Sequence, residues 1–122
     1  MPEVRNHANT TPYSWGDGCE GWRFVTEKDL AVVRERMPPG ASEKRHYHER
    51  ARQVFVVLNG ALELEIHGRT HVLLTGDAIT VAPGLPHSVR NSFITDTIFL
   101  VISSPSHMGD RVETERTRDE RQ

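Results

Sequence analysis

Two histidines separated by one residue, His46 and His48, are the first side chains in this sequence that suggest chemistry. In an extended strand, residues two apart point the same way, so these two imidazoles can converge on one metal ion. Imidazole nitrogen is a ligand that suits zinc, nickel, iron and copper. The same pair also occurs on exposed strands that bind nothing, so its meaning depends on the surrounding sequence.

The spacing around this pair forms two motifs. The first runs Gly40, five residues, His46-Tyr47-His48, four residues, Gln53, six residues, Gly60. The second runs Gly76, five residues, Ala82-Pro83-Gly84, two residues, His87, three residues, Asn91. In order and spacing these motifs resemble those of the cupin family. The resemblance covers residues 40–91 directly, and the neighbouring strands fit it to about residue 104.

The resemblance implies a metal site inside a barrel. Its expected ligands to one divalent ion per subunit are His46, His48, Gln53 and His87. Zinc or nickel is the expected metal, with iron or manganese as alternatives. Gln53 departs from the family, because most metal-binding cupins have a glutamate ligand at that position. Gln53 is therefore either a neutral ligand or a structural amide. Ala82, where the family usually has proline, is expected to alter only a local turn.

A neutral amide in place of a carboxylate leaves the site with the full double charge of the metal. Such a site disfavours oxidation of the metal and favours Lewis-acid polarisation of an anionic substrate oxygen. The expected function is a metal-dependent isomerase, lyase or hydrolase acting on a small anionic or sugar-like substrate. Some cupins that act on unsaturated uronates similarly have glutamine here. The alternatives are a cupin dioxygenase and a non-catalytic small-molecule binding or sensor barrel.

Proton chemistry needs a further group, and Glu35 is the candidate. It shares a strand face with Val33 and Met37, so it is either a general base inside the barrel or an exposed strand residue. Two further sets of side chains are expected to have ordinary roles. The remaining histidines are expected to be solvated: His7, His67, His71 and His107. Three aromatic residues are expected either to rim a pocket or to pack the barrel: Trp15, Trp22 and Phe24.

Short strands must position these residues. Residues 61–66 alternate apolar and polar side chains, and Asn59-Gly60 before them is a strong hairpin signal. About eight such strands between frequent turns predict an all-β fold, a small antiparallel β-barrel or double-stranded jelly roll. Three segments are expected: an N-terminal arm at 1–18, a barrel at 19–109 and a charged tail at 110–122. The tail has nine charged side chains and one aliphatic residue.

Composition and charge limit the classes of binding partner and the cellular compartment that we expect for this protein. The net charge of −2 gives no basic excess for binding nucleic acid, and no apolar run is long enough to span a membrane. The single cysteine, Cys19, excludes an internal disulfide and fits a reducing, cytoplasmic location. Val54–Leu58 and Ile98–Ile102 are apolar on both strand faces, which predicts that a second subunit covers the outer face in a homodimer.

Overall fold

The structure, a computed structural model, describes residues 2–115, and all of its regular elements are strands. In chain order they are β1 (Tyr13–Trp15), β2 (Cys19–Thr26), β3 (Ala31–Met37), β4 (His46–His48), β5 (Arg52–Asn59), β6 (Ala61–Ile66), β7 (Arg69–Leu74), β8 (Ala78–Val81), β9 (His87–Arg90), β10 (Thr97–Ser104) and β11 (Arg111–Glu113). Across residues 2–115, no helix is long and apolar enough to cross a membrane. The predicted all-β fold is confirmed.

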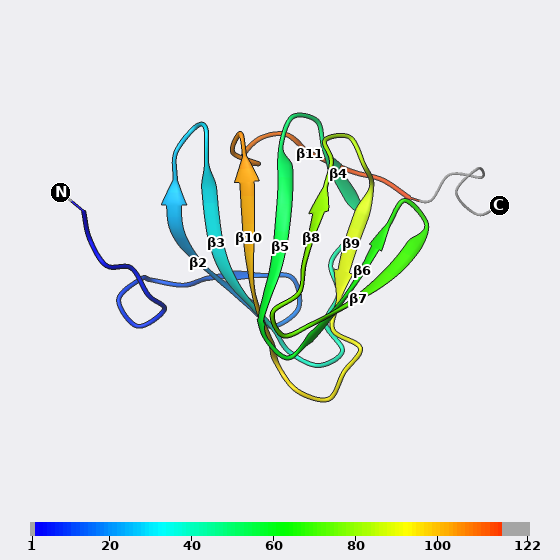
Figure 1. Cartoon of the computed structure of the whole chain (residues 1–122), viewed down its shortest axis with the longest axis horizontal. Coiled ribbons are helices and arrows are strands. Elements are labelled where there is room, and N and C mark those ends of the chain that lie inside the picture. Colours follow the sequence, from blue (N-terminus) through cyan, green and yellow to red (C-terminus); the bar gives the residue numbers. More distant parts are fainter. Residues whose placement is uncertain (1, 116–122) are drawn as a thin grey trace.

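The strands form two antiparallel sheets. The larger has the order β1-β2-β3-β10-β5-β8, and the smaller has the order β11-β4-β9-β6-β7. Figure 1 shows β2, β3, β10, β5 and β8 side by side, with β9, β6 and β7 in the layer beside them. This arrangement is the predicted jelly roll, in which the inner faces of two sheets enclose the core.

The core lies between the two inner faces, and alternation along the strands determines which residues enter it. In β6 the buried residues are Leu62, Leu64 and Ile66, as their alternation with glutamates predicts. From the larger sheet, Phe55 and Phe99 pack into the same cluster. Residues of β10 that point outward are only half-buried, so this strand is not buried on both faces within one chain.

The Asn59-Gly60 turn does not make the predicted hairpin. It carries the chain from β5 in the larger sheet to β6 in the smaller sheet, and these two strands do not pair. Gly60 has φ +97°, and a Cβ there would lie 2.9 Å from the backbone oxygen of Asp96. The glycine is therefore required by a crowded corner between sheets. The adjacent hairpin, β6–β7, turns at His67-Gly68, where both residues have positive φ.

Both segments that the sequence places outside the barrel contribute strands to it. Tyr13–Trp15 pairs with β2, and Arg111–Glu113 pairs with β4. The prediction of a solvated tail is therefore corrected at residues 110–113, where Asp110 is buried and backbone pairing orders a strand despite the charged side chains. Residues 116–122 of the predicted tail lie outside the described residues.

Candidate metal centre

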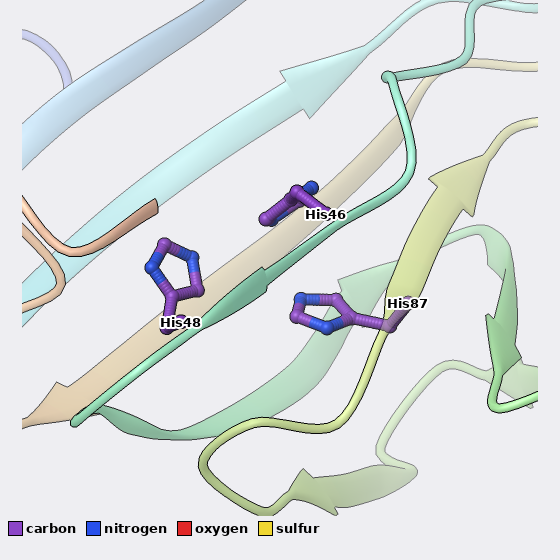
Figure 2. Close-up of side chains that lie close together, drawn as sticks. All are labelled: His46, His48 and His87. Carbon is purple, nitrogen blue, oxygen red and sulfur yellow. The ribbon is translucent and has the colours of Figure 1, made fainter. Parts of the chain in front are cut away.

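Three histidines meet inside the barrel, as the two motifs predict. His46 and His48 come from β4, and His87 comes from β9 at the position paired with His46. All three are buried, and one ligand nitrogen from each lies within 4.8 Å of the others. Figure 2 shows the three side chains projecting from these two strands toward a common space. Three imidazoles at this separation are positioned to bind a metal ion.

Backbone carbonyls fix the orientation of two of these rings. The Nδ1 of His46 lies 2.8 Å from the carbonyl oxygen of Lys44, and the Nδ1 of His87 lies 3.0 Å from that of Leu85. A carbonyl oxygen only accepts, so in each pair Nδ1 carries the proton and donates it. The lone pair of each ring is then on Nε2, which is the arrangement a metal ligand needs.

A carboxylate orients the third ring. The Nδ1 of His48 lies 2.7 Å from Oδ1 of Asp110, and both side chains are buried. The other oxygen, Oδ2, accepts the backbone N–H groups of Arg50 and Ala51, each at 3.0 Å. Burial raises the pKa of Asp110, but the hydrogen bonds from His48 and from the two amides outweigh it and hold the pKa below its usual value. Asp110 is thus an ionised acceptor that holds the proton of His48 on Nδ1.

Burial keeps the imidazoles neutral. Burial is the main reason that the pKa of His46 is lowered to about 3 and that of His87 to about 4, and the neighbouring histidines contribute to both values. Burial also lowers the pKa of His48, against the opposing hydrogen bond and charge of Asp110. Neutral imidazole is the form that binds a metal, so protons do not compete for these nitrogens near neutral pH.

Among the four expected ligands, two buried polar atoms have no hydrogen-bond partner in the described chain: Nε2 of His87 and Oε1 of Gln53. The amide of Gln53 is fixed from the other side, because its Nε2 donates to the hydroxyl of Ser103 at 3.0 Å. A buried acceptor without a partner is costly, and a cation would remove that cost for both atoms. The residues present therefore fit a divalent metal, with the amide oxygen available beside the three nitrogens.

A cavity of about 280 Å³ opens beside the histidines. Its lining combines metal-site residues with charged and aromatic groups: Tyr13, Trp15, Arg23, Glu35, Glu43, His46, His48, Gln53, Phe55, Val89, Val101, His107, Met108, Gly109 and Arg111. The structure thus places Glu35 at the cavity wall, where the sequence left it either inside or exposed. It brings together groups from both sheets and from the segments that flank the barrel.

Two carboxyl groups in the cavity resist ionisation. Burial raises the pKa of Glu35 well above its usual value, and the charge of Glu43 raises it further. Burial raises the pKa of Glu43 to about 8, although its ion pair with Arg111 at 3.8 Å acts in the opposite direction. A carboxyl with a raised pKa can donate a proton as well as accept one. Sequence reasoning missed Glu43, which has no motif of its own.

His107 also belongs to this cavity, so its prediction as a solvated residue is wrong. Its ring centroid lies 5.8 Å from that of His48, and its Nδ1 is buried without a partner in the described chain. Burial lowers its pKa, and the neighbouring His48 lowers it further. Trp15 lines the cavity too and packs against the core, so it has both of the roles considered for it. No spacing in the sequence relates residue 107 to the two motifs.

Comparison with known proteins shows which family this chain is similar to. A family profile described as "Cupin domain" matches residues 33–103. Among curated proteins, the "Oxalate-binding protein" of Thermotoga maritima is 30% identical over 75 residues, which are 62% of this chain and 62% of that protein. The "HTH-type transcriptional regulator PuuR" of Escherichia coli is 28% identical over 65 residues, which are 53% of this chain.

This chain matches only 35% of the length of that regulator, so the similarity concerns one part of it. Among solved structures, KdgF from Halomonas sp. superimposes with a TM-score of 0.76 at 25% sequence identity. The superposition covers 83% of this chain and 93% of KdgF. The match over residues 33–103 includes every strand from β4 to β9, all of β10 except its last residue, and all three histidines. The chain belongs to the cupin family.

Proposed function

We propose that this protein is a metal-dependent enzyme in which one divalent ion polarises a small anionic substrate. The observation that carries the proposal is the orientation of the three imidazoles, each with Nδ1 engaged outward and with their ligand nitrogens gathered in one place. A structural cluster would satisfy all of its buried atoms internally, whereas Nε2 of His87 has no partner in the described chain. Zinc or nickel is the proposed metal, with iron or manganese as alternatives.

In this proposal the ligands are His46, His48, His87 and Gln53. When bound, the metal supplies Lewis-acid polarisation of a substrate oxygen. The four ligand side chains are neutral, so they do not reduce the net charge of the loaded site. Gln53 is decisive here, because a glutamate at its position would reduce that charge by one. Asp110 compensates in part for the missing ligand charge. Its carboxylate accepts the hydrogen bond of His48 Nδ1, which makes Nε2 of the same ring a stronger electron donor to a metal.

Glu35 is the proposed group for proton transfer. Its carboxyl lines the same cavity as His46 and His48 and has a raised pKa, so at neutral pH it can hold a proton and release it to a ligand. Burial is the main cause of that raised pKa, and the charge of Glu43, where that carboxyl is ionised, adds to it. The reaction class that uses these parts is an isomerisation, elimination or hydrolysis at a carbon next to the polarised oxygen.

A small anion is the proposed substrate class. The relative from Thermotoga maritima is named for binding oxalate, a small dicarboxylate, and it matches 62% of this chain. The cavity of about 280 Å³ has room for a ligand of that kind or somewhat larger. Arg23 and Arg111 in the cavity wall provide positive charge in addition to the metal.

A non-catalytic sensor is the second candidate, and one observation favours it. The regulator PuuR contains a segment similar to this chain and is named as a transcription factor. A cupin barrel that binds a small molecule without converting it would fit that comparison. Stoichiometric ligand binding without a product distinguishes a sensor from an enzyme, and oxygen consumption distinguishes a dioxygenase from both.

The proposed assembly is a cytoplasmic homodimer. On the outer face of the larger sheet, Leu100 lies beside Val56, and Ile102 lies beside Val54. These four side chains point away from the core and are half-buried in the single chain. A second copy of the chain would cover this apolar strip.

Metal content tests the proposed function. The native chain and a His46→Ala, His48→Ala double variant are purified identically and analysed by elemental mass spectrometry. About one metal ion per native chain and none in the variant would support the proposal, and the identity of the metal would narrow the chemistry. Absence of metal from the native chain, even after reconstitution with zinc, nickel, manganese and ferrous iron in turn, would overturn it. His71→Ala is the control, because His71 lies on β7 and is not one of the three clustered histidines.

A further inference from the structure

Two residues of the cavity wall form a preassembled pair. Arg23 lies on β2 and Tyr13 on β1, and both line the cavity. The guanidinium carbon of Arg23 is 3.8 Å from the centre of the Tyr13 ring, which is a close cation–π contact. This contact holds the arginine side chain against a rigid support before any ligand arrives.

Gly21 determines where the Tyr13 ring lies. The two residues are directly paired between β1 and β2. A Cβ at position 21 would be 2.4 Å from Cζ of Tyr13 and 2.5 Å from its hydroxyl oxygen, distances that real side chains essentially never show. The hydroxyl end of the ring therefore crosses β2 directly over Gly21, whose partner on β3 is Glu35. Glycine at this position leaves room for the phenol on the inner face of the sheet.

Both polar groups of this pair are unsatisfied by the protein. In the part of the chain that the structure describes, Arg23 has neither an ion pair nor a side-chain hydrogen bond, and the Tyr13 hydroxyl has no hydrogen bond. Arg111, the other cavity arginine, differs because it pairs with Glu43. Burial raises the pKa of Tyr13 to about 12 and the charge of Glu35 also raises it, so the phenol stays protonated and can donate.

We propose that Tyr13 and Arg23 bind an acidic group at one end of a ligand whose other end lies at the three-histidine cluster. The ligand class that follows is a small organic dianion with its two acidic groups at opposite ends, such as a dicarboxylate. The uncompensated guanidinium supplies the charge and the phenol supplies a second hydrogen-bond donor. This inference rests on the proposed function, because the other end of the ligand is held at the metal.

The test measures binding of known dicarboxylates to the zinc-loaded full chain by calorimetry. The probes are oxalate, malonate, succinate and glutarate, with butyrate as a control that has one carboxylate. Arg23→Gln is expected to weaken the best-binding dicarboxylate roughly ten- to a hundredfold, the range for a lost charge-assisted hydrogen bond, and to leave butyrate unchanged. Arg34→Gln is the matched control. Arg34 also stacks on an aromatic ring, Trp22 at 5.0 Å, but it does not line the cavity.

Tyr13→Phe provides a second, milder variant, because it keeps the ring and its contact with Arg23 and removes only the hydroxyl. A loss of severalfold for the same dicarboxylate, with zinc content and circular dichroism unchanged, would support the proposal. Equal affinities for Arg23→Gln and Arg34→Gln would overturn it, as would a zinc-loaded protein that binds none of the four dicarboxylates. Failure of the native chain to bind zinc or any other metal would instead count against the proposed function.

Discussion

Asp110 accepts a hydrogen bond from Nδ1 of His48 at 2.7 Å, although 62 residues separate them in the chain. The contact joins the segment just before β11 to the strand that carries two of the three histidines. It is the only one of the three Nδ1 contacts in which the acceptor is charged. His46 and His87 donate to backbone carbonyls two residues earlier.

Replacing Asp110 with asparagine is expected to weaken metal binding about 10- to 100-fold, the range for loss of an outer hydrogen-bond partner of a ligand histidine. The amide keeps the size of the side chain but removes the negative charge that stabilises the metal-binding tautomer of His48. Competition with a chromophoric chelator measures the affinity. Glu113→Gln on β11 loses the same charge from an exposed side chain that pairs with Lys44 and accepts no hydrogen bond from a histidine ring, and an equal loss in that control would refute the role of Asp110.

Gln53→Glu is expected to bind metal more tightly and small anions more weakly than the native chain. The added carboxylate reduces the net charge of the loaded site by one, which strengthens attraction for the cation and reduces attraction for an anionic ligand. Chelator competition and anion titration of the zinc-loaded protein measure the two effects. Thr80→Glu adds the same charge on the exposed part of β8 and serves as the control. Unchanged metal and anion affinities in Gln53→Glu would contradict the charge argument.

Gly60→Ala is expected to destabilise the protein more than Gly84→Ala. Both glycines have positive φ, +97° and +77°, so both substitutions introduce backbone strain of about 1–3 kcal/mol. Only at Gly60 would the new Cβ also meet backbone, at 2.9 Å from the oxygen of Asp96, whereas it meets nothing within 4 Å at Gly84. Urea unfolding of the metal-free proteins measures the difference. Equal free energies of unfolding would show that the corner between the sheets can relax.

The stability of the metal-free protein is expected to depend on pH through Glu43. Its pKa is about 8 in the folded chain and near 4.5 when unfolded, so the folded state holds the proton more tightly. The stabilisation that this gives is complete below pH 4.5 and is lost as pH rises toward 8. Glu43→Gln cannot ionise and lacks this loss. The free energy of unfolding of the native chain should therefore fall relative to that of Glu43→Gln between pH 4.5 and 8, and a constant difference would be the contrary result.

A single substitution on the outer face of the larger sheet is expected to separate the proposed dimer. Leu100→Glu places a charge in the half-buried apolar strip beside Val56. Light scattering at micromolar concentration should give the mass of two chains for the native protein and one for the variant. Val72→Glu on the exposed part of β7 controls for the added charge. A native protein that is already monomeric would refute the homodimer.

The sequence predicts that these three histidines come together, because the two motifs that contain them resemble those of cupins in order and spacing. His46 and His48 share a strand face by alternation, and the second motif gives the spacing around His87. Strand pairing between β4 and β9 then brings His87 opposite His46, as the family resemblance implies. The alternation of residues 61–66 similarly predicts which side chains of β6 enter the core.

The remaining cavity groups could not be predicted in this way, because their placement depends on contacts between distant segments. Asp110 lies in a stretch of charged residues whose composition indicates a solvated tail, and only pairing of β11 with β4 brings it to His48. Arg23 and Tyr13 reach the cavity through the pairing of β1 with β2. At the Asn59-Gly60 turn, the local signal predicts the turn correctly. It does not show that the turn joins strands of two different sheets, so the predicted hairpin is wrong.

The origin of the cavity wall has an evolutionary consequence. The three clustered histidines lie on β4 and β9 within the smaller sheet, whereas Tyr13 and Trp15 come from the edge strand β1, and His107 and Arg111 from the edge strand β11 and the segment before it. Segments of that kind tolerate substitution and insertion more readily than core strands. Selection can therefore change which ligand the cavity accepts by altering these edge segments, as long as Asp110, which lies among them and orients His48, is kept. In such a scaffold, ligand preference can diverge among descendants of one ancestor while the histidine cluster and Asp110 stay the same.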